Sequence, residues 1–314
     1  MNTITFPHGG RGWLYFLFDN GLYANRINVG IYNAFIGRTS NFEGLSGPFL
    51  FGPSASWVQW RTPTDPNAAF VDLSGAHEVY FEGINMQVQG AHKQPVVHMH
   101  DNKGAGCTDI GFVRCAMGGS VRTFVVDSST PNLSAGFDLR ILDSSITCAV
   151  KGCVALSITN YGYTTVRGGY LASVAINAPP GQFTDGFIFD DLLSESLGGQ
   201  PWLTLNAHVS NLTLTNIRMA DTITRPTYLV KNLQTGAAMT IRNCGWNDGE
   251  SLVDPASVRN GLSAVIEGMG ARATYDLAKA AFQWGQFTST QEPSIWYGNP
   301  TFLHNVGPAM QVRP

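Results

Sequence analysis

The sequence predicts an all-β protein folded as a single-stranded, right-handed parallel β-helix with irregular caps at both ends. Three observations favour this fold: an apolar alternation that recurs along the 314 residues, 35 glycines, and a charged fraction of only 13%. Strict alternation with a period of two is typical of strands. Self-similarity at a period of 20–50 residues is typical of stacked units, each too small to bury its own apolar face.

The repeat consists of eight segments that share one template: apolar, any, apolar, any, small or Asx, then mostly apolar, any, mostly apolar. The segments are VYFEGINM (79–86), IGFVRCAM (110–117), LRILDSSI (139–146), TTVRGGYL (164–171), FIFDDLLS (187–194), LTLTNIRM (212–219), MTIRNCGW (239–246) and AVIEGMGA (264–271). Their fifth positions are Gly83, Arg114, Asp143, Gly168, Asp191, Asn216, Asn243 and Gly268, at steps of 31, 29, 25, 23, 25, 27 and 25 residues. Gly and Asx tolerate left-handed backbone angles, so the fifth position is predicted to turn a corner.

A second apolar strand precedes each segment. These strands are predicted at 69–74, 96–100, 123–129, 154–159, 174–177, 202–207, 228–232 and 251–254. Two or more strands per turn describe a parallel β-helix. The period of two excludes a solenoid of α-helices, and a β-propeller would need longer blades and antiparallel hairpins with tight turns.

The template also separates core positions from surface positions. The first and third positions face inward, and burying each third-position side chain stabilises the fold by roughly 1.5–3 kcal/mol. The fourth position faces outward, which places Asp190 beside Arg167 on the next rung, about 4.8 Å away. Asp191 occupies the corner. The adjacent carboxylates Asp190 and Asp191 are therefore interpreted as an ion-pair partner and a turn residue, not as an acid/base couple.

The repeat divides the chain into three parts. Residues 56–271 form the predicted parallel β-helix. Both ends of a β-helix expose unpaired backbone groups, so each end needs a cap. Residues 1–55 are predicted to be an N-terminal cap or docking segment, and residues 272–314 a C-terminal cap and packing tail. Residues 274–285 fit a short helix opened by Thr274 and stopped at Gly285.

Composition excludes several classes of protein. A net charge of −3 and a pI near 6.1 give no electrostatic footprint for nucleic acid. No run of 18 apolar residues predicts a membrane span, and the N-terminus lacks the basic start of a signal peptide. The five cysteines, Cys107, Cys115, Cys148, Cys153 and Cys244, fit no zinc spacing. We interpret them as free, mostly buried thiols of a protein that folds in a reducing cytoplasm.

The segment WVQWRTPTDPNAAFVDLSGAHEVYFEGINMQVQG (57–90), with the later NLTLTNIRMAD (211–221), resembles the pectin-lyase-like β-helix superfamily, and within it bacteriophage tailspikes. The resemblance covers about residues 55–270. It implies a homotrimeric virion protein, assembled in the host cytoplasm, that docks on other tail proteins. It also implies that the protein binds, and in some relatives cleaves, bacterial surface polysaccharide. No cofactor is implied.

The chain departs from the enzymatic branches of that superfamily. It lacks the Arg-x-Pro-x-x-Arg motif and the calcium-binding Asp cluster of pectate lyases. Of the polygalacturonase motifs it retains only Thr184-Asp185-Gly186 with Asp190-Asp191, and it has no Gly-His-Gly. The motifs therefore do not support the two-carboxylate hydrolysis of those families.

One carboxylate arrangement is a candidate catalytic site. Glu195 follows its corner residue by four positions, while Asp221 and Asp248 follow theirs by five. If the turns superpose, the three would climb consecutive rungs about 5 Å apart, a spacing that suits a retaining glycosidase. The alternative is that Asp248 is a turn residue before Gly249 and that the other two are solvated loop charges.

Aromatic residues near one rung are a candidate glycan platform. The predicted glycan-binding residues are Tyr163, Arg167, Tyr170, Asp190 and Trp202. Aromatic faces stack on sugar rings and Arg bonds hydroxyls, although an interface or turn-packing role explains the same residues. Alternate histidines on a strand can ligate a metal. His98 and His100 lack a third ligand, so they are read as surface or interface histidines and no metal site is predicted.

The outward columns predict an oligomer. Tyr80, Val113, Leu142, Ile188 and Val265 would form an apolar stripe that a monomer rarely leaves exposed, and a closed homotrimer would cover it. Three function classes stay open: a glycan-binding tailspike, a polysaccharide-cleaving enzyme, and a purely structural virion adaptor or decoration protein.

Overall fold

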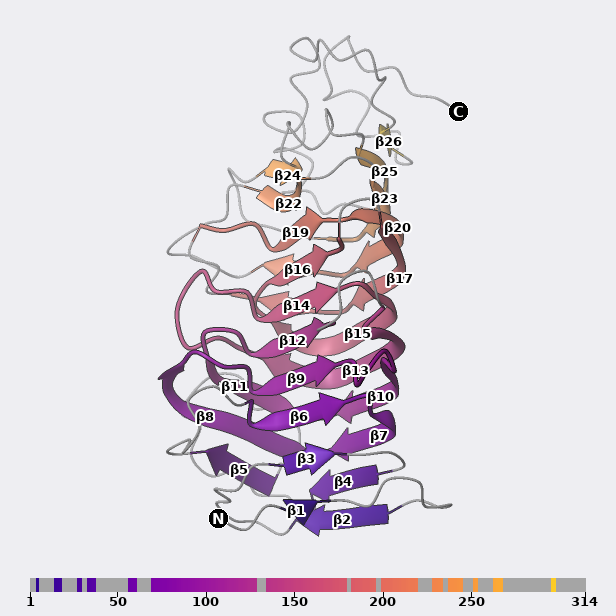
Figure 1. The fold of residues 1–314 in the computed structure, drawn as a ribbon. Coiled ribbons are helices and arrows are strands. Elements are labelled where there is room, and N and C mark those ends of the chain that lie inside the picture. Colours follow the sequence, from indigo (N-terminus) through magenta and orange to yellow (C-terminus); the bar gives the residue numbers. More distant parts are fainter. Residues whose placement is uncertain are drawn as a thin grey trace.

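The computed structural model describes the backbone in fourteen ranges. These are residues 4–5, 14–18, 27–29, 33–37, 56–60, 69–128, 134–179, 182–195, 199–219, 228–233, 237–244, 251–253, 262–267 and 295–297. Their regular elements are all β-strands, which stack as a right-handed parallel β-solenoid (Figure 1). In these ranges, no helix is long and apolar enough to cross a membrane. The predicted fold class is confirmed.

The first sheet runs the length of the solenoid and carries ten parallel strands (Figure 1). In spatial order they are β1 (Ile4–Thr5), β3 (Ile27–Val29), β6 (Val71–Ser74), β9 (Val97–His100), β12 (Phe124–Asp127), β14 (Leu156–Thr159), β16 (Val174–Asn177), β19 (Leu203–Asn206), β22 (Tyr228–Asn232) and β24 (Ser251–Val253). The pairing skips the intervening strands of each turn, as a solenoid requires.

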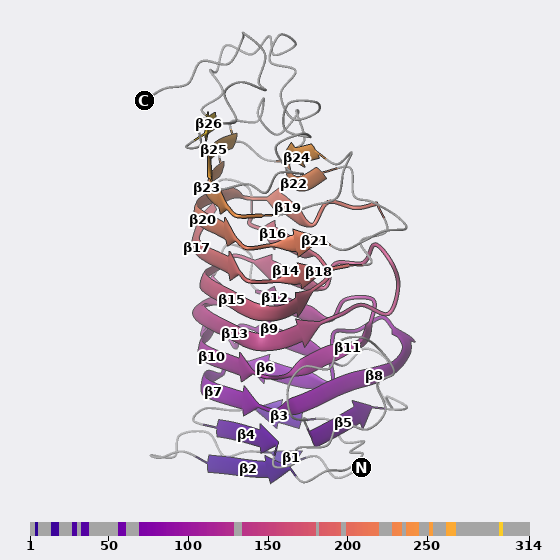
Figure 2. The same cartoon turned by 180° about the vertical axis from the view of Figure 1, so that it is seen from behind.

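A second, longer ladder, called the long sheet below, faces the first sheet across the core (Figure 2). Its strands are β2 (Leu14–Phe18), β4 (Asn33–Gly37), β7 (His77–Glu82), β10 (Cys107–Val113), β13 (Gly136–Ile146), β15 (Tyr161–Leu171), β17 (Phe183–Asp190), β20 (His208–Thr215), β23 (Ala237–Arg242), β25 (Leu262–Glu267) and β26 (Ile295–Tyr297). A third ladder branches from it through β5 (Ser56–Trp60), β8 (Ile84–His92), β11 (Ala116–Ser120), β18 (Leu193–Ser194) and β21 (Arg218–Met219).

The fifth template position turns the corner between the long sheet and the third ladder. Strands β13 and β15 run through this corner, and their last residues pair with the third ladder. Asp143, Asp191, Asn216 and Asn243 adopt φ angles of 48°, 53°, 53° and 50°. Asx side chains visit this left-handed region at lower cost than other side chains do, so the predicted corner role of Asp191 is confirmed.

The residue after the corner closes the turn with its side chain. Ser144 Oγ donates to the carbonyl of Leu142 (2.7 Å), and the Cys115 and Cys244 thiols donate to the carbonyls of Val113 and Arg242 (both 3.4 Å). Burial raises the pKa of both thiols to about 12, so these cysteines are inert at neutral pH.

The prediction of free thiols holds for three of the five cysteines. Cys107, Cys115 and Cys244 are free and buried. For the other two it is wrong, because Cys148 and Cys153 form a disulfide between Cα atoms 6.2 Å apart. The turn between them brings the two thiols together, and their spacing in the sequence gave no sign of it.

The core is formed by the inward columns. The third-position side chains Phe81, Phe112, Ile141, Val166, Phe189, Leu214 and Ile241 are at most 2% exposed, as predicted. Phe81 stacks on Phe112 with ring centroids 4.7 Å apart. Every rung therefore contributes to one continuous apolar column, and the surface chemistry is left to the outward positions.

Parallel pairing begins before residue 56, inside the segment predicted to be a cap or docking segment. Strand β4 pairs with β7 in the register Phe35↔Phe81, and β3 pairs with β6. Gly37 lies level with the corner residue Gly83. The number of residues between them is larger than any step of the repeat, so the template did not detect this rung. The helix predicted at 274–285 lies outside the described residues.

Candidate functional site

The outer face of the long sheet carries a second column of left-handed residues. They are Glu78, Asp109, Asp138, Tyr163, Gly186 and Asn211, with φ angles of 50°, 54°, 65°, 51°, 77° and 53°. Each lies directly before the first template position, so the six stack on consecutive rungs. Extending the template by one residue would have revealed this column, because Asp, Asn and Gly are enriched there.

Tyr163 is the one aromatic residue in that column. A left-handed backbone angle costs a side chain with a Cβ roughly 1–2 kcal/mol, and Asn, Asp and Gly adopt it most readily. Residues held in such strained conformations cluster at functional sites. The presence of a tyrosine where Asn or Gly would be more stable therefore indicates a role for its side chain.

The Tyr163 ring lies over Gly186 on the neighbouring strand β17. A Cβ atom on Gly186 would lie only 2.7 Å from Cδ1 of Tyr163, so the ring fills the space above this glycine. The side chain is nevertheless 61% exposed. One side of the ring is thus supported by the sheet, and the rest is open to solvent.

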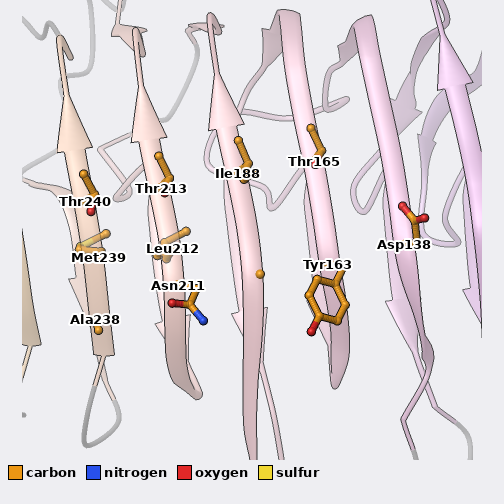
Figure 3. Close-up of a pocket in the computed structure, with 11 residues that line it drawn as sticks. Asp138, Tyr163, Thr165, Ile188, Asn211, Leu212, Thr213, Ala238, Met239 and Thr240 are labelled. Atoms are coloured by element: carbon orange, nitrogen blue, oxygen red, sulfur yellow. The ribbon is translucent and has the colours of Figure 1, made fainter.

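A groove of about 560 Å³ surrounds this tyrosine on the outer face of β13, β15, β17, β20 and β23 (Figure 3). Beside Tyr163 it is lined by Thr165, Ile188, Asn211, Thr213 and Thr240. Figure 3 shows Tyr163 and Thr165 on one strand, with Asp138 on one side and Ile188 on the other. The lining thus combines hydroxyl and amide groups and the Asp138 carboxyl with one aromatic ring and several aliphatic side chains.

Arg167 and Asp190 form the predicted ion pair next to this groove. Arg167 Nε lies 3.2 Å from Asp190 Oδ2 on the adjacent rung, and Asn216 Nδ2 donates to the other carboxylate oxygen at 3.4 Å. The two residues follow Thr165 and Ile188 by two positions, so they lie on the same outer face. They border the groove but do not line it.

Tyr170 and Trp202 are buried, so the prediction that they contact a glycan is wrong for this structure. Trp202 is fully buried; its indole N–H donates to the carbonyl of Leu171 (3.2 Å) and its ring packs edge-on against Phe189. Tyr170 is 5% exposed and its hydroxyl donates to the carbonyl of Glu195 (2.9 Å). Both side chains pack inside the solenoid, where a surface ligand cannot reach their rings.

The predicted catalytic column cannot be assembled from the described residues. Asp221 and Asp248 lie outside them. Glu195 is half-buried directly after β18 of the third ladder and is not among the residues that line the groove. The arrangement of Glu195, Asp221 and Asp248 stays a prediction.

The carboxyl groups of Asp109 and Asp138 are neighbours in the left-handed column. The hydrogen bond between Asp109 and Asp138 raises the pKa of Asp109 above its usual range, with burial as a smaller cause. Arg140 Nε donates to Asp138 Oδ1 at 2.9 Å. Asp109 therefore holds its proton to a higher pH than an ordinary carboxyl does.

The histidines of β9 bind carboxylates on the neighbouring rungs. His100 Nε2 lies 2.7 Å from Asp72 Oδ1 on β6, and His98 Nε2 lies 2.8 Å from Asp127 Oδ1 on β12. The two imidazole rings are 4.6 Å apart. Among the described residues, no group of three or more potential ligands could hold a metal ion.

The groove is suited to binding an extended ligand that carries both apolar faces and hydroxyl groups. Thr and Asn side chains donate and accept hydrogen bonds, while the Tyr163 ring offers a flat apolar contact. The comparisons with known proteins add no assignment: no protein-family model matches the chain, nor does any curated protein or any solved structure.

Proposed function

We propose that this protein binds polysaccharide at a bacterial cell surface, as a tailspike-like attachment protein does, through the groove around Tyr163. The observation that carries the proposal is the exposed tyrosine, held at a strained backbone angle with its ring supported by Gly186. A left-handed backbone angle costs stability at a tyrosine, which favours selection for binding.

The chemistry of the lining favours a sugar ligand. A sugar ring has an apolar C–H face, which packs on an aromatic ring, and a rim of hydroxyl groups, which bond Thr and Asn side chains. Thr165 on β15, Asn211 and Thr213 on β20, and Thr240 on β23 supply such groups. The groove is open along the sheet, so a long chain can enter without threading through a closed pocket.

Assignment to a virion rests on the tailspike resemblance, which also implies a homotrimer. Ile188 of the predicted apolar stripe lines the groove, so the trimer in this proposal rests on the resemblance and not on the stripe. Light scattering of the purified protein should give three times the chain mass of 33.9 kDa. A single-chain mass at micromolar concentration would contradict the trimer.

Binding to purified bacterial capsule and O-antigen polysaccharides, half of them neutral and half acidic, tests the glycan proposal. We expect at least one polysaccharide to bind, and Tyr163→Asn to weaken that binding about tenfold or more. The matched control is Phe137→Ala, which removes a 53% exposed aromatic side chain outside the groove. Absence of binding to the whole panel would favour the structural virion protein instead. Equal losses in both variants would remove the groove from the proposal.

A further inference from the structure

A second groove of about 500 Å³ lies on the same outer face, closer to the N-terminal end of the solenoid. It is lined by Tyr80, Gly111, Val113, Arg140 and Leu142, with Glu78 and Asp109 at its edge. These residues come from β7, β10 and β13. In the part of the chain that the structure describes, the two grooves share no lining residue.

The second groove repeats the tyrosine-over-glycine arrangement of the first. A Cβ atom on Gly111 would lie 2.8 Å from Cδ2 of Tyr80, so the Tyr80 ring lies over this glycine of the next rung. Tyr163 likewise lies over Gly186 of the rung that follows its own. Both rings lean in the same direction along the solenoid axis, and both remain partly open to solvent.

The two grooves meet at β13. Asp138 lines the first groove, while Arg140 and Leu142 line the second. Arg140 bonds Asp138 across this boundary, so an ion pair between an exposed Arg140 and a half-buried Asp138 separates the hollows. Strand β7 lies three rungs from β15, which places the tyrosines about 14 Å apart along the axis. This distance spans several sugar rings of a linear chain.

The charges along this path select the kind of chain. The ionisable groups that line the two grooves, besides the tyrosines, are Glu78, Asp109, Asp138 and Arg140. Three carboxyl groups thus face one guanidinium, and that guanidinium is already bonded to Asp138. A glycan rich in carboxylates or phosphates would be repelled along this path, because like charges at short range are unfavourable.

We infer that the ligand is an uncharged linear glycan that lies along the solenoid axis and occupies both grooves, with Tyr80 and Tyr163 as its two stacking positions. The inference rests on the proposed function and adds to it a second binding site, a direction and a ligand class. Tyr80 contacts the glycan directly, and Gly111 keeps the hollow beside it open.

The test uses the neutral polysaccharides of the panel that bind, cut into fragments of two to eight sugars. We expect affinity to rise with length until both grooves are filled. Tyr80→Ala should weaken the long fragments about tenfold and leave the shortest fragments unchanged, whereas Tyr163→Asn should weaken all lengths. Gly111→Ala keeps Tyr80 but displaces its ring, so it should reproduce the length-dependent loss if Tyr80→Ala fails to fold.

The outcomes separate the inference from the proposed function. If Tyr163→Asn weakens binding while Tyr80→Ala and Gly111→Ala do not, the protein has one subsite: the function stands and the inference is wrong. If only acidic polysaccharides bind, the uncharged ligand is wrong. If no polysaccharide binds, the proposed function itself fails.

Discussion

The two long faces of the solenoid are built on the same core but treat their outward side chains differently. On the first sheet, polar side chains bond one another from rung to rung: Asp72 with His100, His98 with Asp127, and Asn206 with Asn177 (2.9 Å). On the long sheet, the outward face is hollowed by two grooves with a tyrosine over a glycine in each. On the first sheet the outward polar side chains pair with one another, whereas the long sheet combines such pairs, as at Arg167 and Asp190, with the lining of two grooves.

The comparison shows which positions of a β-solenoid can carry functional residues. Inward columns must be apolar on both sheets, so they carry fold and nothing else. Outward columns do not have to be apolar, so their residues can serve another function. A self-bonded outward column adds stability, whereas an outward column with a strained aromatic residue gives up stability, which is a sign of selection for another property.

The largest effect is expected from a charge placed in the apolar core, on which both faces are built. Phe189 is fully buried and packs against Trp202. Phe189→Asp places an unpaired carboxylate there, at a cost of several kcal/mol. We expect loss of soluble protein in an expression assay, with Ile188→Asp on the exposed side of the same strand as the control. Soluble, folded Phe189→Asp protein would mean that the two faces do not depend on one core.

The next effect separates stability from binding on the long sheet. Tyr163→Asn removes the aromatic ring but suits the left-handed backbone, so the free energy of unfolding should rise by about 1 kcal/mol. Calorimetric melting compared with wild type measures this gain, while polysaccharide binding falls. A lower melting temperature in the variant would show that Tyr163 serves the fold.

A pH-dependent effect is expected on the first sheet. The hydrogen bond to Asp72 raises the pKa of His100, and burial opposes it more weakly. His100 Nδ1 also faces the Asp101 carbonyl at 3.1 Å, so both ring nitrogens have acceptors and the doubly protonated imidazole fits best. The folded state therefore holds this proton more tightly than the unfolded chain does.

The stabilisation by His100 should be complete below about pH 6.5, the usual pKa of histidine, and should be lost as pH rises through the raised pKa of the folded state. His100→Gln should cost about 1 kcal/mol in mildly acidic solution and less in alkaline solution. Denaturant titrations across the pH range measure the difference. His208→Gln, on an exposed site of β20, controls for loss of an imidazole, and a pH-independent difference for His100→Gln would contradict the ion pair.

The smallest effect is expected at the edge of the second groove. The raised pKa of Asp109 means that its hydrogen bond with Asp138 is complete at acidic pH and weakens as pH rises through that pKa. Asp109→Asn keeps an N–H donor at every pH and suits the φ of 54°. Stability at neutral pH should rise by about 0.2–1 kcal/mol, with no gain in strong acid. Thermal melting at both pH values checks this, with Asp185→Asn as the control.

The repeat predicted the inward columns and one corner because both leave a periodic signature. Phe81, Phe112 and Phe189 recur at the third position, and Asp143 and Asp191 at the fifth. The second left-handed column was missed because it lies one residue before the template. Four of its six members are Asp, Asn or Gly, but Glu78 and Tyr163 interrupt that pattern.

The candidate site was predicted only in part. The Arg167–Asp190 pair followed from strand register, which alternation fixes, whereas Tyr163 was chosen because aromatic residues gather near its rung. Trp202 and Tyr170 were predicted to be exposed because each lies at the end of a strand, where alternation no longer distinguishes inward from outward side chains. The Cys148–Cys153 bond depends on how one loop folds back, and no periodic pattern reports that.

The direction of the hydrogen bonds between rungs has a mechanical consequence. In both sheets these bonds join strands stacked along the solenoid axis. Tension applied between the two ends would load them one rung at a time, so the molecule should peel from an end at modest force. A force directed across the axis meets whole rungs, each bonded to two neighbours and filled by the same apolar columns. The solenoid is thus stiff against bending and sideways load and weakest where its last rung is exposed.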